Sequence, residues 1–212
     1  MPQKIEALDA LLDGQPVIPV VVVEEAASAV PMARALVAGG LPMIEVTLRT
    51  AAALDAIRAI AEEVEGARVG AGTVLTARQF GEAVEAGSRF VVSPGATRSL
   101  LETASDSEVP LLPGAVTASE VMAALDDGYR FLKFFPAGTS GGAAALKALS
   151  APLPEARFCP TGGVSADNAR DYLALPNVMC VGGSWVVPKE AVASGDWARV
   201  EALAREARGL AG

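Results

Sequence analysis

One lysine stands in the middle of an apolar run, where a cation is unusual. The stretch RFLKFFPAG, residues 130–138, surrounds Lys133 with aromatic and aliphatic residues. It could be an edge-strand lysine that discourages aggregation, or a lysine that buries its stem and lifts its ammonium into water. It could instead be a buried amine, because a desolvated lysine loses its proton more readily and becomes a nucleophile toward carbonyl groups.

A second stretch places a carboxylate and a guanidinium on one face of an expected strand. Read with a period of two, MIEVTLR at residues 43–49 has an apolar face and a polar face that carries Glu45, Thr47 and Arg49. Four residues along a strand span roughly 13 Å, too far for a direct Glu45–Arg49 ion pair. Because such groups are costly to bury unless they pair or bind a ligand, the pattern favours a site over a structural ion pair.

Two glycine-rich turns offer backbone N–H groups to an anion. TGGVS at residues 161–165 and GGSW at residues 182–185 each follow an expected strand. Glycines let the backbone approach a ligand closely, and the turns after the seventh and eighth strands of a (β/α)8 barrel commonly bind phosphate. Either turn alone would be an ordinary glycine turn. Thr73, in GAGTVL at residues 70–75, adds a hydroxyl after the third strand.

The elements that must position these residues alternate regularly along the chain. Short apolar or β-branched runs begin near Val17, Met43, Arg68, Phe90, Pro110, Phe131, Arg157 and Met179. Between them, apolar residues recur at helical spacing, as Leu54, Ile57 and Ile60 do. Eight strand–helix units predict an α/β fold, a (β/α)8 TIM barrel whose C-terminal mouth holds the chemistry.

The first segment, residues 3–12, is predicted to be an extra N-terminal helix packed on the barrel. The alternative architecture is an open doubly wound sheet, but no complete G-x-G-x-x-G opens a helix. With 212 residues and no visible linker, residues 1–212 are expected to form a single domain.

Composition narrows the chemistry and the partners. The chain contains no histidine, which excludes a Ser–His or Cys–His nucleophile and a histidine-ligated zinc. A net charge of −8 argues against nucleic acid and anionic membrane as partners. The two cysteines, Cys159 and Cys180, lie in apolar runs and are expected to be core thiols in a reducing compartment. Without a signal-peptide pattern at its N-terminus, the protein is expected to be cytoplasmic.

The chain resembles bacterial 2-keto-3-deoxy-6-phosphogluconate (KDPG) aldolase, a family also active as 4-hydroxy-2-oxoglutarate (KHG) aldolase. The resemblance runs over essentially the whole chain and is densest in GLPMIEVTLR, residues 40–49, and GYRFLKFFPAGTSG, residues 128–141. One departure is Gly138, at a position where many relatives have an acidic residue. It lies in the loop beyond the lysine and bears on substrate breadth rather than on the chemistry.

The resemblance implies a class I aldolase that cleaves its sugar acid into pyruvate and glyceraldehyde 3-phosphate, without a cofactor or metal. It implies Lys133 as the Schiff-base lysine and Glu45 as the general acid–base. It also implies Arg49 and Thr73 as ligands of the substrate carboxylate and Thr161 beside the substrate. The residues implied in phosphate binding are Gly162, Gly163 and Ser184. The expected partners are a small 2-keto acid, a phosphorylated substrate and, as in similar enzymes, further copies of the chain in a homotrimer.

Two other functions remain open from the residues themselves. A metal-independent sugar-phosphate isomerase or synthase would use the glycine turns and keep Lys133 as a charge. A barrel without activity would only bind phosphorylated acids. Only the aldolase is expected to form a borohydride-stable adduct with pyruvate.

Overall fold

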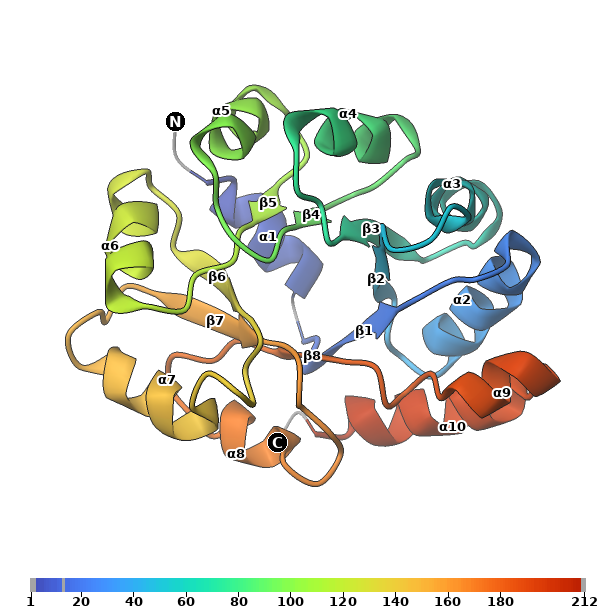
Figure 1. Cartoon of the computed structure of the whole chain (residues 1–212). Coiled ribbons are helices and arrows are strands. Elements are labelled where there is room, and N and C mark those ends of the chain that lie inside the picture. Colours follow the sequence, from blue (N-terminus) through green and yellow to red (C-terminus); the bar gives the residue numbers. More distant parts are fainter. Residues whose placement is uncertain (1–2, 13, 211–212) are drawn as a thin grey trace.

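The computed structural model describes residues 3–12 and 14–210 and has an α/β fold of parallel strands alternating with helices (Figure 1). Each predicted apolar run contains or directly precedes a strand. The strands are β1 (Val17–Val21), β2 (Met43–Thr47), β3 (Arg68–Gly72), β4 (Val91–Val92), β5 (Leu111–Leu112), β6 (Phe131–Phe134), β7 (Arg157–Pro160) and β8 (Val181–Gly183).

The helices form an outer layer around the strands, apart from α1, which precedes the first strand. They are α1 (Ile5–Leu12), α2 (Ala29–Ala38), α3 (Ala53–Glu63), α4 (Ala77–Glu85), α5 (Arg98–Asp106), α6 (Ala118–Asp126), α7 (Gly142–Ser150), α8 (Ala169–Leu173), α9 (Lys189–Ser194) and α10 (Trp197–Arg208), with a short 3₁₀ helix η1 (Ala26–Ser28) before α2. No helix in the described ranges combines the length and apolar character needed to span a bilayer.

The strands pair in parallel as a curled sheet. Six of them follow the order β5-β4-β3-β2-β1-β8, and β6 pairs with β7 in a second ladder. Isolated parallel bridges link the two groups: Gly114–Lys133 on one side, and Phe158–Val178 and Thr161–Gly182 on the other. The α/β class and the parallel order predicted from the sequence are thereby confirmed.

Strands β4 and β5, at one end of the six-stranded sheet, are shorter than their apolar runs suggested, at two residues each. Prolines follow closely, Pro94 after β4 and Pro113 after β5. Because proline has no N–H to donate to a ladder, regular pairing ends there. The chain continues in the same direction and brings its polar loops to the C-terminal end of the sheet.

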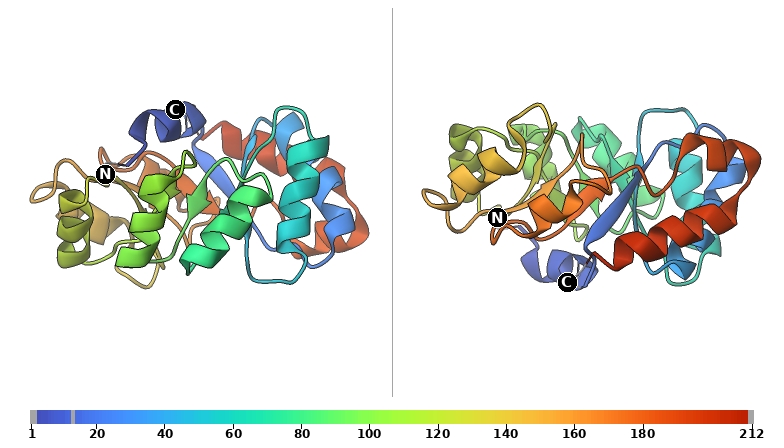
Figure 2. Two further views of the ribbon diagram at one scale, coloured as in Figure 1. Left: turned by 90° about the horizontal axis from the view of Figure 1, so that it is seen from above. Right: turned by 90° about the horizontal axis from the view of Figure 1, so that it is seen from below.

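Alternating strand residues divide the core into two layers. Ile44 and Val46 of β2 point outward and pack with helix residues such as Ile57 and Ile60. The inner layer contains residues from the beginnings of strands together with one face of α1: Leu8, Leu11, Leu12, Ile18, Met43, Phe90, Val92, Leu112, Cys159 and Cys180. Helix α1 therefore covers the N-terminal end of the strands, where it projects from the molecule (Figure 2).

Candidate active site

A buried lysine and a buried glutamate meet on the inner side of the curled sheet. Lys133 of β6 and Glu45 of β2 have exposed fractions of only 6 % and 2 %. The Lys133 Nζ donates to Glu45 Oε1 over 2.9 Å. Because the whole lysine side chain is buried, the interpretation in which its ammonium extends into water is excluded. Its strand is also no free edge, since it pairs with β7 and bridges to Gly114. Of the interpretations open from the sequence, the buried amine is therefore the one that the structure supports.

The aromatic neighbours of Lys133 differ in how deeply they are buried. Phe131 and Phe135 are each two residues from Lys133, so the strand period of two assigns both to its face. Phe131 does pack against the inner core layer, but Phe135 lies beyond the strand and is 38 % exposed. The Lys133 Nζ lies 5.5 Å from the centroid of the Phe135 ring. The ring therefore covers the amine from the solvent side and stabilises it as a cation while it carries its proton.

Arg49 and Thr73 follow two adjacent strands at the same end of the sheet. Because β2 ends at Thr47, Arg49 lies in the following turn, beyond the C-terminal end of the strand. Its side chain is exposed and forms no ion pair with any residue that the structure describes. Thr73 follows β3 directly and has a φ of 58°, a left-handed conformation uncommon for threonine.

The turn after β7 is held against the loop after β6. Thr161 is buried, its carbonyl accepts from the N–H of Ala137 over 2.8 Å, and the Gly162 carbonyl accepts from Gly138 over 2.8 Å. Both Gly162 and Gly163 have positive φ, 86° and 79°. Non-glycine residues rarely adopt this conformation, so the two glycines are required by the shape of the turn.

Ser184 follows β8 and is exposed, with Gly182 and Gly183 buried immediately before it. Thr161 and Gly182 are bridge partners, so the turns after β7 and β8 are adjacent. Since parallel strands end on the same side, the predicted site residues from β2, β3, β6, β7 and β8 gather at one end of the sheet.

Two thiols lie beside this pair, a feature that the sequence reasoning treated only as core. Cys159 is the register partner of Lys133 on β7, and its Sγ lies 4.0 Å from Thr161 Oγ1. Both cysteines are free and buried. A hydrogen bond of the Cys180 S–H with Cys159, burial and the nearby Glu45 carboxylate raise the pKa of the Cys180 thiol well above its usual value. The Cys180 thiol therefore stays neutral close to the charged pair.

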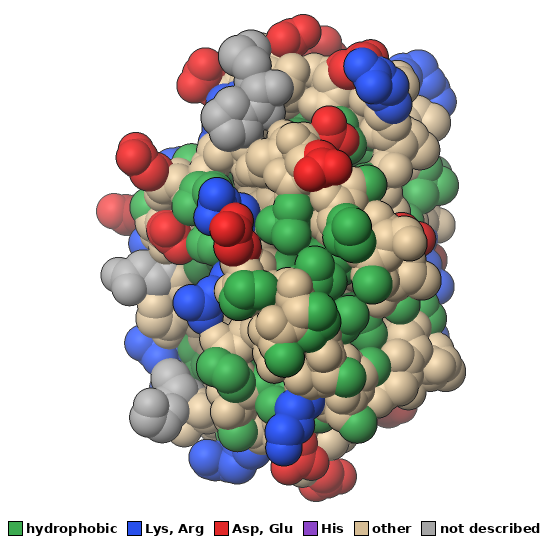
Figure 3. All heavy atoms as spheres, turned by 90° about the vertical axis from the view of Figure 1, so that its left-hand side faces the viewer, with side chains coloured by type: hydrophobic (Ala, Val, Ile, Leu, Met, Phe, Trp, Pro, Cys, Tyr) green, Lys and Arg blue, Asp and Glu red, His purple; other side chains and the backbone are tan. Residues whose placement is uncertain are grey.

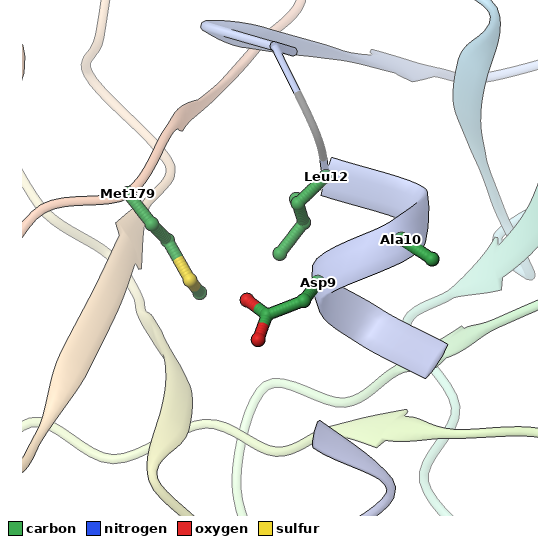
Figure 4. A pocket seen from close by; sticks show the side chains of 4 residues that line it. All are labelled: Asp9, Ala10, Leu12 and Met179. Atoms are coloured by element: carbon green, nitrogen blue, oxygen red, sulfur yellow. The ribbon is translucent and has the colours of Figure 1, made fainter. Parts of the chain in front are cut away.

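A hollow of about 500 Å³ lies at the opposite end of the strands. Asp9, Ala10 and Leu12 of α1 and Met179 line it, with the Asp9 carboxylate directed into it (Figure 4). None of the predicted site residues contributes to it. The paired lysine and carboxylate, rather than this hollow, identify the site. Within the described ranges, no three His, Cys, Asp or Glu side chains gather as a metal site.

Fold and site together define an α/β protein with a buried lysine–carboxylate pair toward the C-terminal ends of parallel strands. A family model described as KDPG and KHG aldolase matches residues 8–203. This chain therefore belongs to the KDPG and KHG aldolase family.

Individual relatives agree over nearly the whole length. The 2-dehydro-3-deoxy-phosphogluconate aldolase of Pseudomonas aeruginosa is 57 % identical over 205 residues, covering 97 % of this chain and 93 % of that protein. The KHG/KDPG aldolase of Escherichia coli K12 is 54 % identical over 199 residues, covering 94 % and 93 %. The crystal structure of KDPG aldolase from Legionella pneumophila, with pyruvate captured as a covalent carbinolamine intermediate, has a TM-score of 0.90 at 47 % identity, covering 92 % of this chain and 95 % of that one.

Proposed function

We propose that this protein is a class I aldolase that cleaves KDPG into pyruvate and glyceraldehyde 3-phosphate, and KHG into pyruvate and glyoxylate. The observation that carries the proposal is the 2.9 Å contact between buried Lys133 and Glu45. It provides a nucleophilic amine and a proton acceptor in one enclosed place. The carbinolamine of pyruvate in the Legionella pneumophila relative is the intermediate that such an amine forms.

Lys133 begins the reaction by attacking the C2 carbonyl of the substrate. Glu45 takes the ammonium proton beforehand, so that the nitrogen lone pair is free. The carbinolamine hydroxyl then takes this proton back from Glu45 and leaves as water, which gives a cationic imine and restores the Glu45 carboxylate. As the C3–C4 bond breaks, its electron pair moves to the imine nitrogen and forms an enamine, while Glu45 accepts the proton of the C4 hydroxyl.

Release of the aldehyde leaves pyruvate attached as the enamine. The enamine takes a proton at C3 and returns to the imine, and water then hydrolyses the imine to free pyruvate and Lys133. Glu45 is placed to donate the proton at C3, because its Oε1 touches the nitrogen to which the substrate is bound. One carboxylate therefore serves both proton transfers.

The groups around the pair fit the rest of the substrate. Arg49, exposed at the same end of the sheet, supplies a planar guanidinium for the carboxylate at C1, with Thr73 as a hydroxyl donor nearby. Thr161 lies beside the substrate. The turns that contain Gly162, Gly163 and Ser184 present backbone N–H groups to the phosphate.

The architecture proposed for this single catalytic domain is a closed eight-strand barrel with α1 as an extra N-terminal helix. Bridges at Gly114–Lys133 and Thr161–Gly182 support closure of the curled sheet. The two free buried thiols support a reducing, cytoplasmic location.

We also propose that the enzyme assembles as a homotrimer. Apolar side chains gather on the face that carries α6 and α7 (Figure 3), and Met122 of α6 is 56 % exposed. An exposed apolar patch is the kind of surface that another subunit covers. Light scattering at micromolar concentration should give three chain masses, and a monomer mass would contradict the assembly.

The activity is tested by measuring pyruvate release from KDPG and from KHG in parallel. The wild-type enzyme should release pyruvate from both, while Lys133→Arg should release none from either, because arginine keeps the charge but cannot form the imine. Lys147→Arg is the matched control and should retain wild-type rates. Substantial turnover by Lys133→Arg would overturn the proposal.

A further inference from the structure

Gly72 occupies a position that only a residue without a side chain can fill while the catalytic pair stays together. A Cβ placed there would lie 2.1 Å from Glu45 Oε1, 2.6 Å from its Cγ and 2.7 Å from its Cδ. All three are far below ordinary contact distance, and all three belong to one side chain. We propose that Gly72 is a positioning residue for catalysis, one that leaves the space in which the Glu45 carboxylate reaches Lys133.

The strand register explains why the two residues meet. Glu45 on β2 is paired with Gly70 of β3, and Gly72 lies two residues further toward the C-terminal end of that strand. The Glu45 side chain therefore crosses onto β3 and lies over Gly72, pointing toward the mouth. From there its Oε1 is 2.9 Å from Lys133 Nζ across the interior.

Space, rather than backbone conformation, is the reason for this glycine. Gly72 is not among the glycines with positive φ, in contrast to Gly162 and Gly163. Its backbone also resembles that of any strand residue, with its carbonyl accepting from the N–H of Leu48 over 2.8 Å. Alanine can adopt that backbone without strain, so the missing side chain is the property that matters.

The consequence of adding a methyl group differs from that at other buried glycines. At Gly114 a Cβ would lie 2.1 Å from the backbone carbonyl oxygen of Pro94. This carbonyl can move only if the backbone after β4 moves with it. At Gly72 the obstacle is a flexible side chain, which can swing aside. A Gly72→Ala variant should therefore fold with Glu45 displaced from Lys133, which separates positioning from folding.

This inference rests on the proposed function, since it assigns Gly72 a role through the general acid–base Glu45. The two can be tested apart with Gly72→Ala, Glu45→Ala, the double variant and the control Gly95→Ala. A Cβ at Gly95, in the turn after β4, would meet nothing within 4 Å. For each enzyme, the exchange of the pyruvate C3 protons in D₂O is followed by NMR, and imine formation is followed by borohydride trapping.

Gly72→Ala should slow C3 proton exchange by roughly 10²-fold, the size expected for loss of a positioned general base. It should still trap pyruvate on Lys133. In the Glu45→Ala background the same substitution should change exchange by less than about threefold, because the side chain that it displaces is gone. Gly95→Ala should match wild type.

A role confined to packing would reduce exchange equally in both backgrounds, and that result would overturn the inference. So would wild-type exchange in Gly72→Ala, or a crystal structure of that variant in which Glu45 Oε1 remains 2.9 Å from Lys133 Nζ. If Glu45→Ala itself exchanges at the wild-type rate, the proposed function of Glu45 fails. A displaced carboxylate in the Gly72→Ala crystal would then leave only the geometric part of the inference standing.

Discussion

At the scale of single residues, the site depends on a charge pair that is buried on both sides. Lys133 and Glu45 are each removed from water and satisfy each other over 2.9 Å. Neither side chain has another side-chain ion partner within the described ranges. Losing one member therefore leaves the other as an uncompensated buried charge.

Replacing Lys133 by methionine should cost stability as well as activity. The reason is that Glu45 would lose its partner and remain buried without it, at a cost of about 3 kcal/mol. Urea unfolding of Lys133→Met should show this loss, and Lys133→Met/Glu45→Met should recover most of it. A single variant as stable as wild type would contradict the coupling.

Strand periodicity was sufficient to predict Lys133 and Glu45, because a period of two assigns a face to each residue. The period says less about Arg49, because the strand ends at Thr47 and the rule does not extend into a turn. Gly72 could not be predicted as a partner of Glu45. Their contact depends on the register between β2 and β3, which the sequence of either strand does not reveal.

At the scale of elements, the side chain of Gln3 joins β5 to β6 where their direct pairing is sparse. Its Nε2 donates to the carbonyls of Leu111 (3.0 Å) and Phe131 (2.8 Å). Its Oε1 accepts from the N–H groups of Arg130 (3.0 Å) and Phe131 (2.9 Å). Gln3 is buried, so these contacts replace part of a missing strand ladder and hold the chain before α1 in place.

Gln3→Ala should destabilise the protein by about 2–4 kcal/mol, because it leaves several buried backbone groups without partners. The matched control is Gln79→Ala on α4, which removes one hydrogen bond to the N–H of Leu75 in an exposed position. The Gln79→Ala variant should lose less than about 1 kcal/mol of stability. Equal midpoints in urea for the two variants would show that Gln3 does not join the strands.

Helix α6 begins with a capping box whose contribution should depend on pH. Thr117 Oγ1 accepts from the N–H of Glu120, and the Glu120 carboxylate accepts from the N–H groups of Thr117 and Val116. These backbone hydrogen bonds lower the pKa of Glu120 from its usual 4.5. Its stabilisation is therefore present above pH 4.5 and is lost as the pH falls through the lowered folded-state pKa.

Glu120→Ala should accordingly lower stability at pH 7 by roughly 0.5 kcal/mol, a small value because the group is exposed. The difference from wild type should shrink as the pH is lowered below 4.5. Thermal melts of wild type and Glu120→Ala between pH 7 and pH 3 measure this difference in stability. A difference that grows on acidification would contradict the assigned direction of the pKa shift.

At the scale of the whole molecule, parallel strands collect residues from distant parts of the chain at one end. The regular spacing of apolar runs was enough to predict the α/β class and, to within two residues, where each of the eight strands begins. The sequence could not reveal that the ladder between β5 and β6 reduces to a single bridge. Strand pairing there depends on Pro113, which has no N–H to donate, and on the side chain of Gln3, which is distant in the sequence from both strands.

The proposed phosphate turn should distinguish the two substrates. In Gly163→Ala, a Cβ would lie 3.2 Å from Gly138 Cα in a backbone with a φ of 79°, so the turn must shift. Cleavage of KDPG should fall at least about tenfold more than cleavage of KHG. The reason is that the phosphate of KDPG would lose a charge-assisted hydrogen bond, whereas KHG has no phosphate. Parallel kcat/KM values measure this. Equal losses on both substrates would mean that the turn is only structural.

The most direct test of the whole account is to identify the lysine that binds pyruvate. The chain has four lysines, Lys4, Lys133, Lys147 and Lys189. After incubation with pyruvate and borohydride, digestion and mass spectrometry should locate one reduced adduct per chain, on the peptide that contains Lys133. An adduct on Lys4, Lys147 or Lys189, or no adduct in an enzyme that cleaves KDPG, would contradict the mechanism.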